Sequence, residues 1–387
     1  MGRQITAVQT FCLKLSSADP YLGLAPAGSQ ASSYFVRPPW RSLYSHGYET
    51  LLVRLETDDG HTGWGECLAP VAPEVPRAVI DTMLAPQLIG ADPGAPRPVS
   101  LRLAGLMRER GHLVGHQADA LAACDIALWD LAGKVAGLPV AQLIGGAFRS
   151  ALPVYVSGLP RPTDAERAEL AADWAAKGFR RIKLALGYGV EQDLATFDAV
   201  AAAAPGLAIG IDAHWAYTLP EAERLGLELD RRRAWFLEAP LAPEDVRGHR
   251  SLADLIVTPV AVGESLRNRF EFADWLGRRA MDLCQPDVAR TGITEALEAA
   301  SIAAAAHLRV APHHSVGLGV ALAAGLQFAA AIENLEVFEF QPTTLPHANR
   351  ILAGPVQLDG SSFRLPDGPG LGVTVDEQAV IDLSETM

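Results

Sequence analysis

The sequence contains few cysteines, with four among 387 residues. They lie far apart and include no Cys-x-x-Cys pair, so neither a zinc site nor a framework of disulfides is expected. Buried, reduced thiols are the simpler interpretation for all four, which are Cys12, Cys67, Cys124 and Cys284.

Basic residues are scarce relative to acidic ones, with 32 Lys and Arg against 45 Asp and Glu and a formal net charge of −13. A surface that binds phosphates needs clustered Lys and Arg, and those of this chain are scattered. The composition therefore argues against nucleic acid or an anionic membrane as a partner.

Long apolar runs are also missing. The longest, near residues 320–332, is too short to span a bilayer, and no charged and then apolar leader opens the chain. These features favour a cytoplasmic protein with no membrane partner. With 49% hydrophobic and 20% charged residues, the chain has the composition of a globular protein with a large core.

The first third of the chain has the pattern of an α+β domain. Residues 4–15 alternate apolar and polar side chains, and two further strand-like runs flank the turn at Asp58-Asp59-Gly60. Helical patterns follow, the clearest of them at residues 118–136. Residues 16–46 are rich in Pro and Gly, which predicts no regular element, and also in aromatic residues, which favours a lid over a disordered linker.

From about residue 153, short apolar runs alternate with helical patterns. Most runs end in one polar side chain, and successive ends are 23 to 29 residues apart, about the length of one βα unit. These ends are Lys183, Asp212, Glu238, Glu264, Asp287, His313 and Glu339. The repetition predicts a closed parallel α/β barrel with one polar group at the C-terminal mouth of each of these strands.

The last part of the chain, at residues 356–375, returns to strands and turns and is expected to pack on the N-terminal domain. The predicted organisation is thus a capping domain with lid loops at residues 1–125, a barrel at 126–345, and a segment at 346–387 that returns to the cap.

Three successive strand ends carry carboxylates, namely Asp212, Glu238 and Glu264. On adjacent strands these groups would converge and repel one another, and a hard divalent cation with oxygen ligands relieves that repulsion. Mg²⁺ suits such a partly hydrated site. Each acid alone could instead cap a helix or pair with an Arg, but three in register favour a metal.

Asp287 and His313 end the next two strands. A carboxylate that accepts a hydrogen bond from one imidazole nitrogen fixes the tautomer and raises the basicity of the other nitrogen. His313 is therefore a candidate general base with Asp287 as its partner. The neighbouring His314 and a purely structural role are the alternatives, and the strand-end position favours His313.

Two further polar groups are expected at the barrel mouth. Lys183 would place an ammonium near a substrate carboxylate or a developing enolate, with a surface Lys at a strand edge as the alternative. His214 follows Asp212 by two residues and is expected on the same strand face. Its side chain would reach the same cavity, or would hydrogen-bond a neighbouring acid without lining the cavity itself.

Taken in order, these motifs resemble the enolase superfamily, in particular its mandelate-racemase-like subgroup, over essentially the whole chain. The motifs are Thr62-Gly-Trp-Gly-Glu, Asp125-Ile-Ala-Leu-Trp-Asp-Leu-Ala-Gly-Lys, Glu238-Ala-Pro, Gly263-Glu264, Gln285-Pro-Asp, Pro312-His and Pro366-Asp-Gly-Pro-Gly-Leu-Gly. Each is weak alone, but their order and spacing are specific. The implied fold is a modified TIM barrel of (β/α)7β type with an α+β N-terminal capping domain that the C-terminal segment completes.

The resemblance also implies a mechanism, in which the proton α to a carboxylate is removed and Mg²⁺ stabilises the enediolate. The three strand-end carboxylates would hold Mg²⁺, His313 would take the proton, and Glu339 would hydrogen-bond the substrate carboxylate. The lid would select the substrate, with Arg37, Trp40 and Arg41 as candidate contacts. A homo-oligomer is implied as well.

One departure from the family pattern limits the reactions that the site could catalyse. Relatives with a lysine base carry Lys-x-Lys, whereas this chain has Lys183-Leu184-Ala185, and Ala185 cannot move a proton. A single base fits dehydration of a sugar acid to a 2-keto-3-deoxy sugar acid, with His214 as the candidate acid for the departing hydroxyl.

The main alternative is a cycloisomerase that opens a sugar-acid lactone of the galactarolactone type, because a carboxylate leaves without protonation. A racemase or epimerase and a non-catalytic relative are further alternatives.

Overall fold

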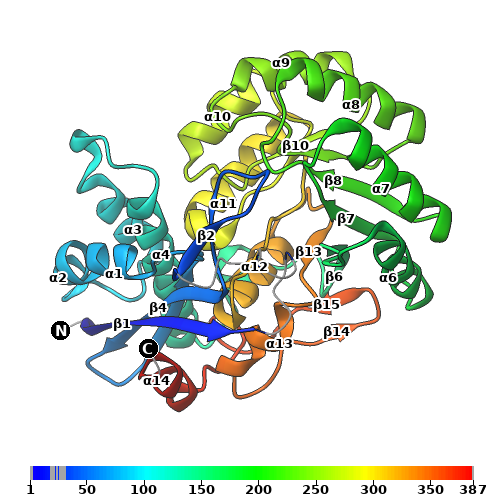
Figure 1. The fold of residues 1–387 in the computed structure, drawn as a ribbon. Helices are drawn as coiled ribbons and strands as arrows, with labels where there is room; N and C mark the ends of the chain where they lie inside the picture. Colours follow the sequence, from blue (N-terminus) through cyan, green and yellow to red (C-terminus); the bar gives the residue numbers. More distant parts are fainter. Residues whose placement is uncertain (1–2, 18–21, 23–24, 26–31, 386–387) are drawn as a thin grey trace.

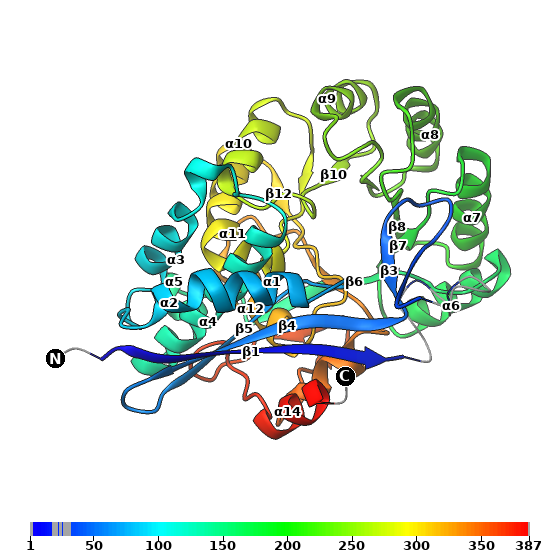
Figure 2. The ribbon, with the colours of Figure 1, turned by 60° about the vertical axis from the view of Figure 1, so that its left-hand side comes forward.

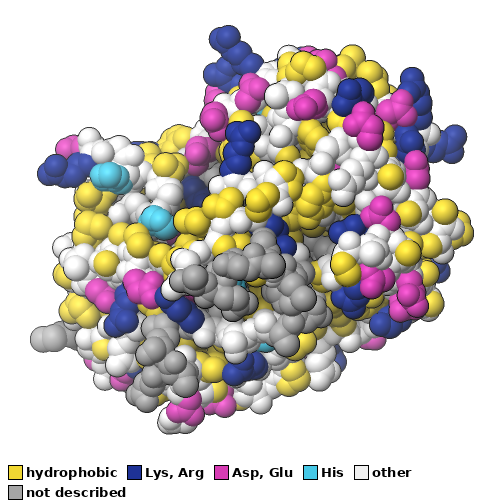
Figure 3. All heavy atoms as spheres, in the orientation of Figure 1, with side chains coloured by type: hydrophobic (Ala, Val, Ile, Leu, Met, Phe, Trp, Pro, Cys, Tyr) yellow, Lys and Arg dark blue, Asp and Glu magenta, His cyan; other side chains and the backbone are white. Residues whose placement is uncertain are grey.

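The computed structural model describes residues 3–17, 22, 25 and 32–385. An antiparallel sheet with its helices lies along one side of a parallel barrel (Figure 1). None of the helices in these described residues is long and apolar enough to cross a membrane. On the face shown in Figure 3, positive and negative side chains are interspersed around the periphery.

The N-terminal sheet has the strand order β1-β4-β5. Its strands are β1 (Ile5–Ser16), β4 (Gly47–Thr57) and β5 (Thr62–Cys67), with the predicted turn at Gly60 between the last two. Helices α1 (Glu74–Val79), α2 (Ala85–Leu88), α3 (Pro96–Gly105) and α4 (His116–Ala136) follow. A π-helical turn, η2 (Ile80–Leu84), joins α1 to α2, and a 3-10 turn, η3 (Arg108–Arg110), follows α3.

Helix α4 joins the two parts of the molecule. It is continuous across residues 125 and 126, and it packs against both β5 and α11 (Val288–Ala305). The glycines of the Thr62-Gly-Trp-Gly-Glu motif allow this contact, because a Cβ atom on Gly65 would lie only 1.9 Å from the carbonyl oxygen of Ala123. The motif is therefore explained by the close approach of a helix to a strand.

Strands β6 to β13 alternate with helices α6 to α12, as the (β/α)7β pattern requires. The strands are β6 (Ala151–Ser157), β7 (Arg181–Ala185), β8 (Ala208–Asp212), β9 (Leu237–Glu238), β10 (Val260–Val262), β11 (Leu283–Cys284), β12 (Arg309–Val310) and β13 (Phe338–Phe340). The helices are α6 (Asp164–Ala176), α7 (Val190–Ala203), α8 (Leu219–Arg232), α9 (Val246–Leu255), α10 (Arg269–Gly277), α11 and α12 (Gly319–Ala331). A short helix, α5 (Val140–Ile144), precedes β6.

The barrel is closed. Strand β13 pairs in parallel with β6, and a bridge between Val310 and Leu335 joins the last two strands of the series. Inside it, a cluster of buried side chains that includes Tyr155 and Phe236 forms the floor beneath the strand ends. Gly210 makes room for this layer, since a Cβ atom there would meet the Phe236 ring at 2.7 Å.

The lid contains more regular structure than its Pro and Gly content predicts. Strands β2 (Tyr34–Val36) and β3 (Leu43–Ser45) form a short antiparallel hairpin, and β1 extends to Ser16. The prediction of no regular element was therefore wrong at residues 34–45, because two alternating runs of three residues can pair across the Pro38-Pro39 turn. Part of the predicted lid, between residues 18 and 31, lies outside the described residues.

The C-terminal segment contacts both parts of the molecule. Helix α14 (Glu377–Glu385) packs on β1 of the N-terminal domain. The hairpin of β14 (Leu358–Asp359) and β15 (Ser362–Arg364) instead extends the barrel sheet next to β6, so the prediction that residues 356–375 pack on the N-terminal domain was wrong for this hairpin. A short helix, α13 (Leu345–Ala348), and a 3-10 turn, η4 (Asn349–Ile351), connect β13 to this hairpin.

Candidate active site

A cavity of about 330 Å³ lies between the C-terminal ends of the barrel strands and the N-terminal domain. Its barrel side includes Lys183, Asp212, Glu264, His313 and Glu339, and its other side includes residues 42–45 of the lid hairpin. Figure 2 shows this hairpin beside the ends of β7 and β8. Five of the seven predicted strand-end residues therefore line one cavity, and the other two, Glu238 and Asp287, contact Lys183 and His313.

Strand register brings the carboxylates together. Asp212 pairs with Glu238 across β8 and β9, and Ala261 of β10 pairs with Glu238 in turn. Glu264 follows β10 by two residues, so the three acids lie at the same edge of the barrel. Burial raises the pKa of Asp212 to about 6 and that of Glu238 to about 7.

Lys183 is the cation at the centre of this edge. Its Nζ lies 2.8 Å from Glu238 Oε1, 2.9 Å from Glu339 Oε1 and 3.9 Å from Asp212 Oδ2. Burial acts to lower the pKa of Lys183, but the surrounding acids raise it well above its ordinary value. Lys183 is thus a buried ammonium that offsets part of the charge of the acids, and not a surface residue.

His313 is held between two carboxylates. Its Nδ1 lies 2.6 Å from Asp287 Oδ2, the contact expected from their spacing, and its Nε2 lies 2.9 Å from Glu264 Oε2. Although burial opposes it, Glu339 and Glu264 raise the pKa of His313 well above its ordinary value. Asp287 also accepts a hydrogen bond from Ala289 N and so caps α11, which fixes the position of the carboxylate.

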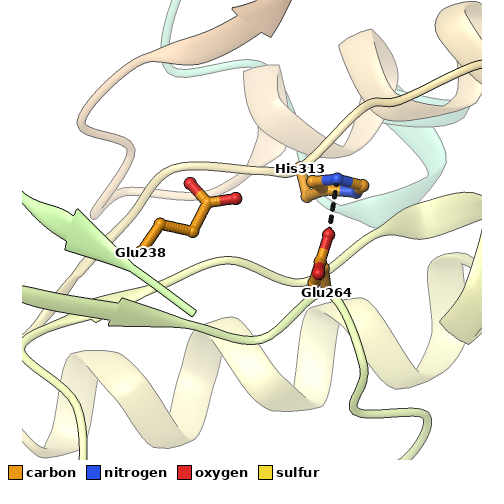
Figure 4. A group of neighbouring side chains, drawn as sticks. All are labelled: Glu238, Glu264 and His313. Atoms are coloured by element: carbon orange, nitrogen blue, oxygen red, sulfur yellow. Dashed lines mark ion pairs between the residues drawn. The ribbon is translucent and has the colours of Figure 1, made fainter. Parts of the chain in front are cut away.

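One carboxylate oxygen of Glu238, one of Glu264 and a ring nitrogen of His313 lie within 4.8 Å of one another. Figure 4 shows the Glu264 carboxylate directed at His313, with Glu238 at the side of the same space. These residues could hold a metal ion. Asp212, a predicted ligand, is outside this group, although Asp212 and Glu238 both form ion pairs with Lys183.

The donor set fits Mg²⁺. The buried carboxylates of Asp212 and Glu238 and the partly buried carboxylate of Glu264 supply hard oxygen ligands, and burial raises the pKa of the first two because it opposes their negative charge. His313 is already engaged through Nδ1 by Asp287. An all-carboxylate set of Asp212, Glu238 and Glu264 is therefore the better match to a hard cation than a set that includes the imidazole.

His214 lies beyond the strand on which it was expected. Strand β8 ends at Asp212, and His214 has a positive φ of 48°, so the period of two no longer applies. Its ring nevertheless lines the cavity, with Nδ1 3.4 Å from Asp212 Oδ1. Burial lowers the pKa of His214 to about 4.

Of the three predicted lid contacts, Trp40 contacts His214 of the cavity wall. Its indole stacks on His214 with ring centroids 4.0 Å apart, and its Nε1 donates to the carbonyl oxygen of Leu186. Arg37 lies over the Phe35 ring, and Arg41 is exposed. Neither arginine is among the residues that line the cavity.

Several residues at the site were missed. Trp215 Nε1 donates to Glu264 Oε1 at 3.0 Å, and Gln285 Nε2 donates to Glu238 Oε2 at 2.6 Å. Gln285 belongs to the Gln285-Pro-Asp motif, so its sequence signal was available. Arg290, Ser265 and Gln341 also line the cavity, but they follow the strand ends by one to three residues, where strand spacing gives no signal.

The chain belongs to the enolase superfamily. A model described as the mandelate racemase / muconate lactonizing enzyme N-terminal domain matches residues 37–145, and one described as the enolase C-terminal domain-like family matches residues 166–379. The predicted family and fold class are confirmed.

Individual relatives are more specific. The chain is 34% identical over 350 residues to D-galactarolactone cycloisomerase from Agrobacterium fabrum, covering 86% of this chain and 90% of that protein. It is 31% identical over 380 residues to D-galactonate dehydratase from Ralstonia pickettii, and the match covers 92% of this chain and 94% of that protein. A crystal structure of an enolase-superfamily member from Agrobacterium tumefaciens superposes with a TM-score of 0.93 at 36% identity, covering 98% of each chain.

Proposed function

We propose that this protein removes the proton α to the carboxylate of a sugar acid and then eliminates water, giving a 2-keto-3-deoxy sugar acid. The observation that carries the proposal is His313, held by Asp287 through Nδ1 with its Nε2 directed at the carboxylate cluster. Relatives named as arabinonate dehydratase and D-galactonate dehydratase support the same interpretation.

Asp212, Glu238 and Glu264 are the proposed ligands of Mg²⁺. The bound ion would hold the substrate carboxylate and stabilise the negative charge of the enediolate. Trp215 and Gln285 each donate to one of these ligands and would keep their free oxygens in position.

Lys183 is proposed to bind the substrate carboxylate, and Glu339 is proposed to donate a hydrogen bond to it when it is in its protonated form. The Lys183 ammonium is fixed by ion pairs and needs no reorganisation when charge develops on the substrate. Glu339 is held by Lys183 and by the backbone N–H of His314, so its position is equally fixed. Together they would orient the α-carbon towards His313.

The reaction is proposed to use one base. Ala185 ends strand β7 next to Asp212, where Lys-x-Lys relatives have an ammonium. A methyl group there cannot return a proton to the opposite face of the α-carbon, so elimination is favoured over racemisation. His214 remains the proposed acid for the departing hydroxyl, since its ring lines the cavity.

Lactone cycloisomerisation is the second candidate. The relative that is 34% identical is named as a galactarolactone cycloisomerase, and burial keeps His214 in its neutral form by lowering its pKa to about 4. A lactone needs no acid at this position, because its carboxylate leaves unaided.

The test is a screen of sugar acids and their lactones with Mg²⁺, followed by analysis of keto products and of ring opening. Dehydration of a free sugar acid by the wild type, abolished in His313→Asn, is the expected result. Turnover of lactones alone would select the cycloisomerase, and no turnover of either class would contradict both. The predicted homo-oligomeric state and cytoplasmic location stay predictions.

A further inference from the structure

Arg290 occupies a distinctive place in the cavity wall. It lies in the first turn of α11, three residues after Asp287, and it lines the cavity. Its neighbour Ala289 accepts a backbone hydrogen bond from Leu68 of the N-terminal domain at 2.9 Å. Arg290 therefore lines the cavity close to the point where the barrel contacts the N-terminal domain.

The guanidinium of Arg290 has no partner within the described part of the chain. Its Nε is buried and makes no hydrogen bond there. Lys183, the other Lys or Arg among the described residues of the cavity wall, is by contrast engaged by three carboxylates. A buried donor on a charged group is costly to leave unpaired, so the site is built for a ligand that supplies the acceptor.

Two more cavity residues have buried polar atoms without a partner among the described residues, namely Ser265 Oγ and Gln341 Oε1. Ser265 follows Glu264 directly in the sequence, and the amide nitrogen of Gln341 donates to Ser157. The cavity wall thus offers a cationic donor, a hydroxyl and an amide acceptor that are not all satisfied by the described residues.

We propose that Arg290, assisted by Ser265, binds the distal carboxylate of a substrate that is acidic at both ends, an aldaric acid or its lactone. A guanidinium matches a carboxylate with two parallel N–H···O bonds, whereas the hydroxymethyl end of an aldonic acid offers no charge to it. Gln341 Oε1 would accept a hydrogen bond from a hydroxyl along the chain. This assignment rests on the proposed function and names the substrate class of the same site.

Binding measurements separate the subsite from the chemistry. Calorimetric titration with Mg²⁺ present would compare an aldarate with the aldonate of the same configuration, using His313→Asn as the parent so that neither ligand reacts. The parent should bind the aldarate about 10- to 100-fold more tightly, the range expected for a hydrogen-bonded charge pair. Adding Arg290→Met should remove that preference and leave aldonate affinity within about threefold.

The controls exclude a general loss of structure. Arg290→Lys keeps the charge without the paired donors and should retain part of the preference, and Ser265→Ala should reduce it by less than Arg290→Met. Arg224→Met changes an exposed arginine of α8 and should alter neither affinity. Mg²⁺ affinity without ligand should not fall in Arg290→Met, because removal of a positive charge near Glu264 does not weaken a cation site.

Equal binding of the two ligands by the parent, or an equal loss of both in Arg290→Met, would overturn the subsite. The protein could prefer the aldarate through Arg290 and yet turn over no sugar acid or lactone. That result would support the subsite and refute the proposed reaction.

Discussion

Asp287 has two separable roles, and its substitution tests both. Its Oδ2 holds His313 Nδ1 at 2.6 Å, while its Oδ1 accepts from Ala289 N and caps α11. Asp287→Asn keeps an acceptor for the cap but removes the charge beside the imidazole. Asp287→Ala removes both.

The loss of a charge-assisted hydrogen bond costs about 1.5–3 kcal/mol, so the rate of α-proton removal should fall about 10- to 150-fold in both variants. Loss of the cap costs about a further 1 kcal/mol of stability in Asp287→Ala alone, or about 1–3 °C in melting temperature.

Exchange of the substrate α-proton for solvent deuterium, followed by NMR, measures the rate of α-proton removal, and circular dichroism measures the melting temperature. Wild-type exchange in Asp287→Asn would refute the role of Asp287 in supporting His313. A rate loss confined to Asp287→Ala would assign the effect to the displaced helix and not to the missing charge.

Three further predictions concern the frame around the site. Burial raises the pKa of Glu66 to about 7. This pKa is higher than the pKa of Glu66 in the unfolded protein. The contribution of Glu66 to the free energy of unfolding is therefore fully present below about pH 4.5 and is lost as the pH rises to 7. Glu66→Gln should lose less stability over that range, as measured by urea midpoints at pH 5 and pH 8, and parallel midpoints would contradict this. Gly65→Ala would place a Cβ atom against a carbonyl oxygen of α4 and should destabilise the protein by at least about 3 kcal/mol, whereas Gly105→Ala, which has open space in a helix, should stabilise it by up to about 1 kcal/mol. Thermal melting of both variants decides this, and equal shifts would refute the packing argument. Trp215→Phe removes the donor to Glu264 Oε1 and should weaken Mg²⁺ binding about 10- to 100-fold in a calorimetric titration, and unchanged affinity would show that the indole does not orient this ligand.

Much of the barrel and its central residues could be predicted from the sequence. The C-terminal ends of parallel strands share one edge, so regular spacing alone was enough to bring Lys183, Glu238 and His313 together. The closure of the sheet follows from the same repetition.

The residues that spacing could not place lie outside the strands. His214 lines the cavity through a left-handed turn after β8, and Trp40 reaches it from the lid by stacking. Arg37 and Arg41 are adjacent to Trp40 in sequence but do not line the cavity. Which lid residues contact the cavity depends on how the hairpin packs on the barrel. Whether Arg290 lines the cavity depends on the direction of the first turn of α11. Neither property leaves a periodic pattern in the sequence.

The central claim is that His313 removes an α-proton and that no second base returns it to the opposite face. The most direct measurement is turnover of a reactive sugar acid or lactone in D₂O with Mg²⁺, followed by NMR of both product and recovered substrate. We expect one solvent deuterium at C3 of the product, recovered substrate with unchanged configuration at the α-carbon, and no reaction in His313→Asn. Recovered substrate with inverted configuration, or product formation by His313→Asn at the wild-type rate, would contradict this account.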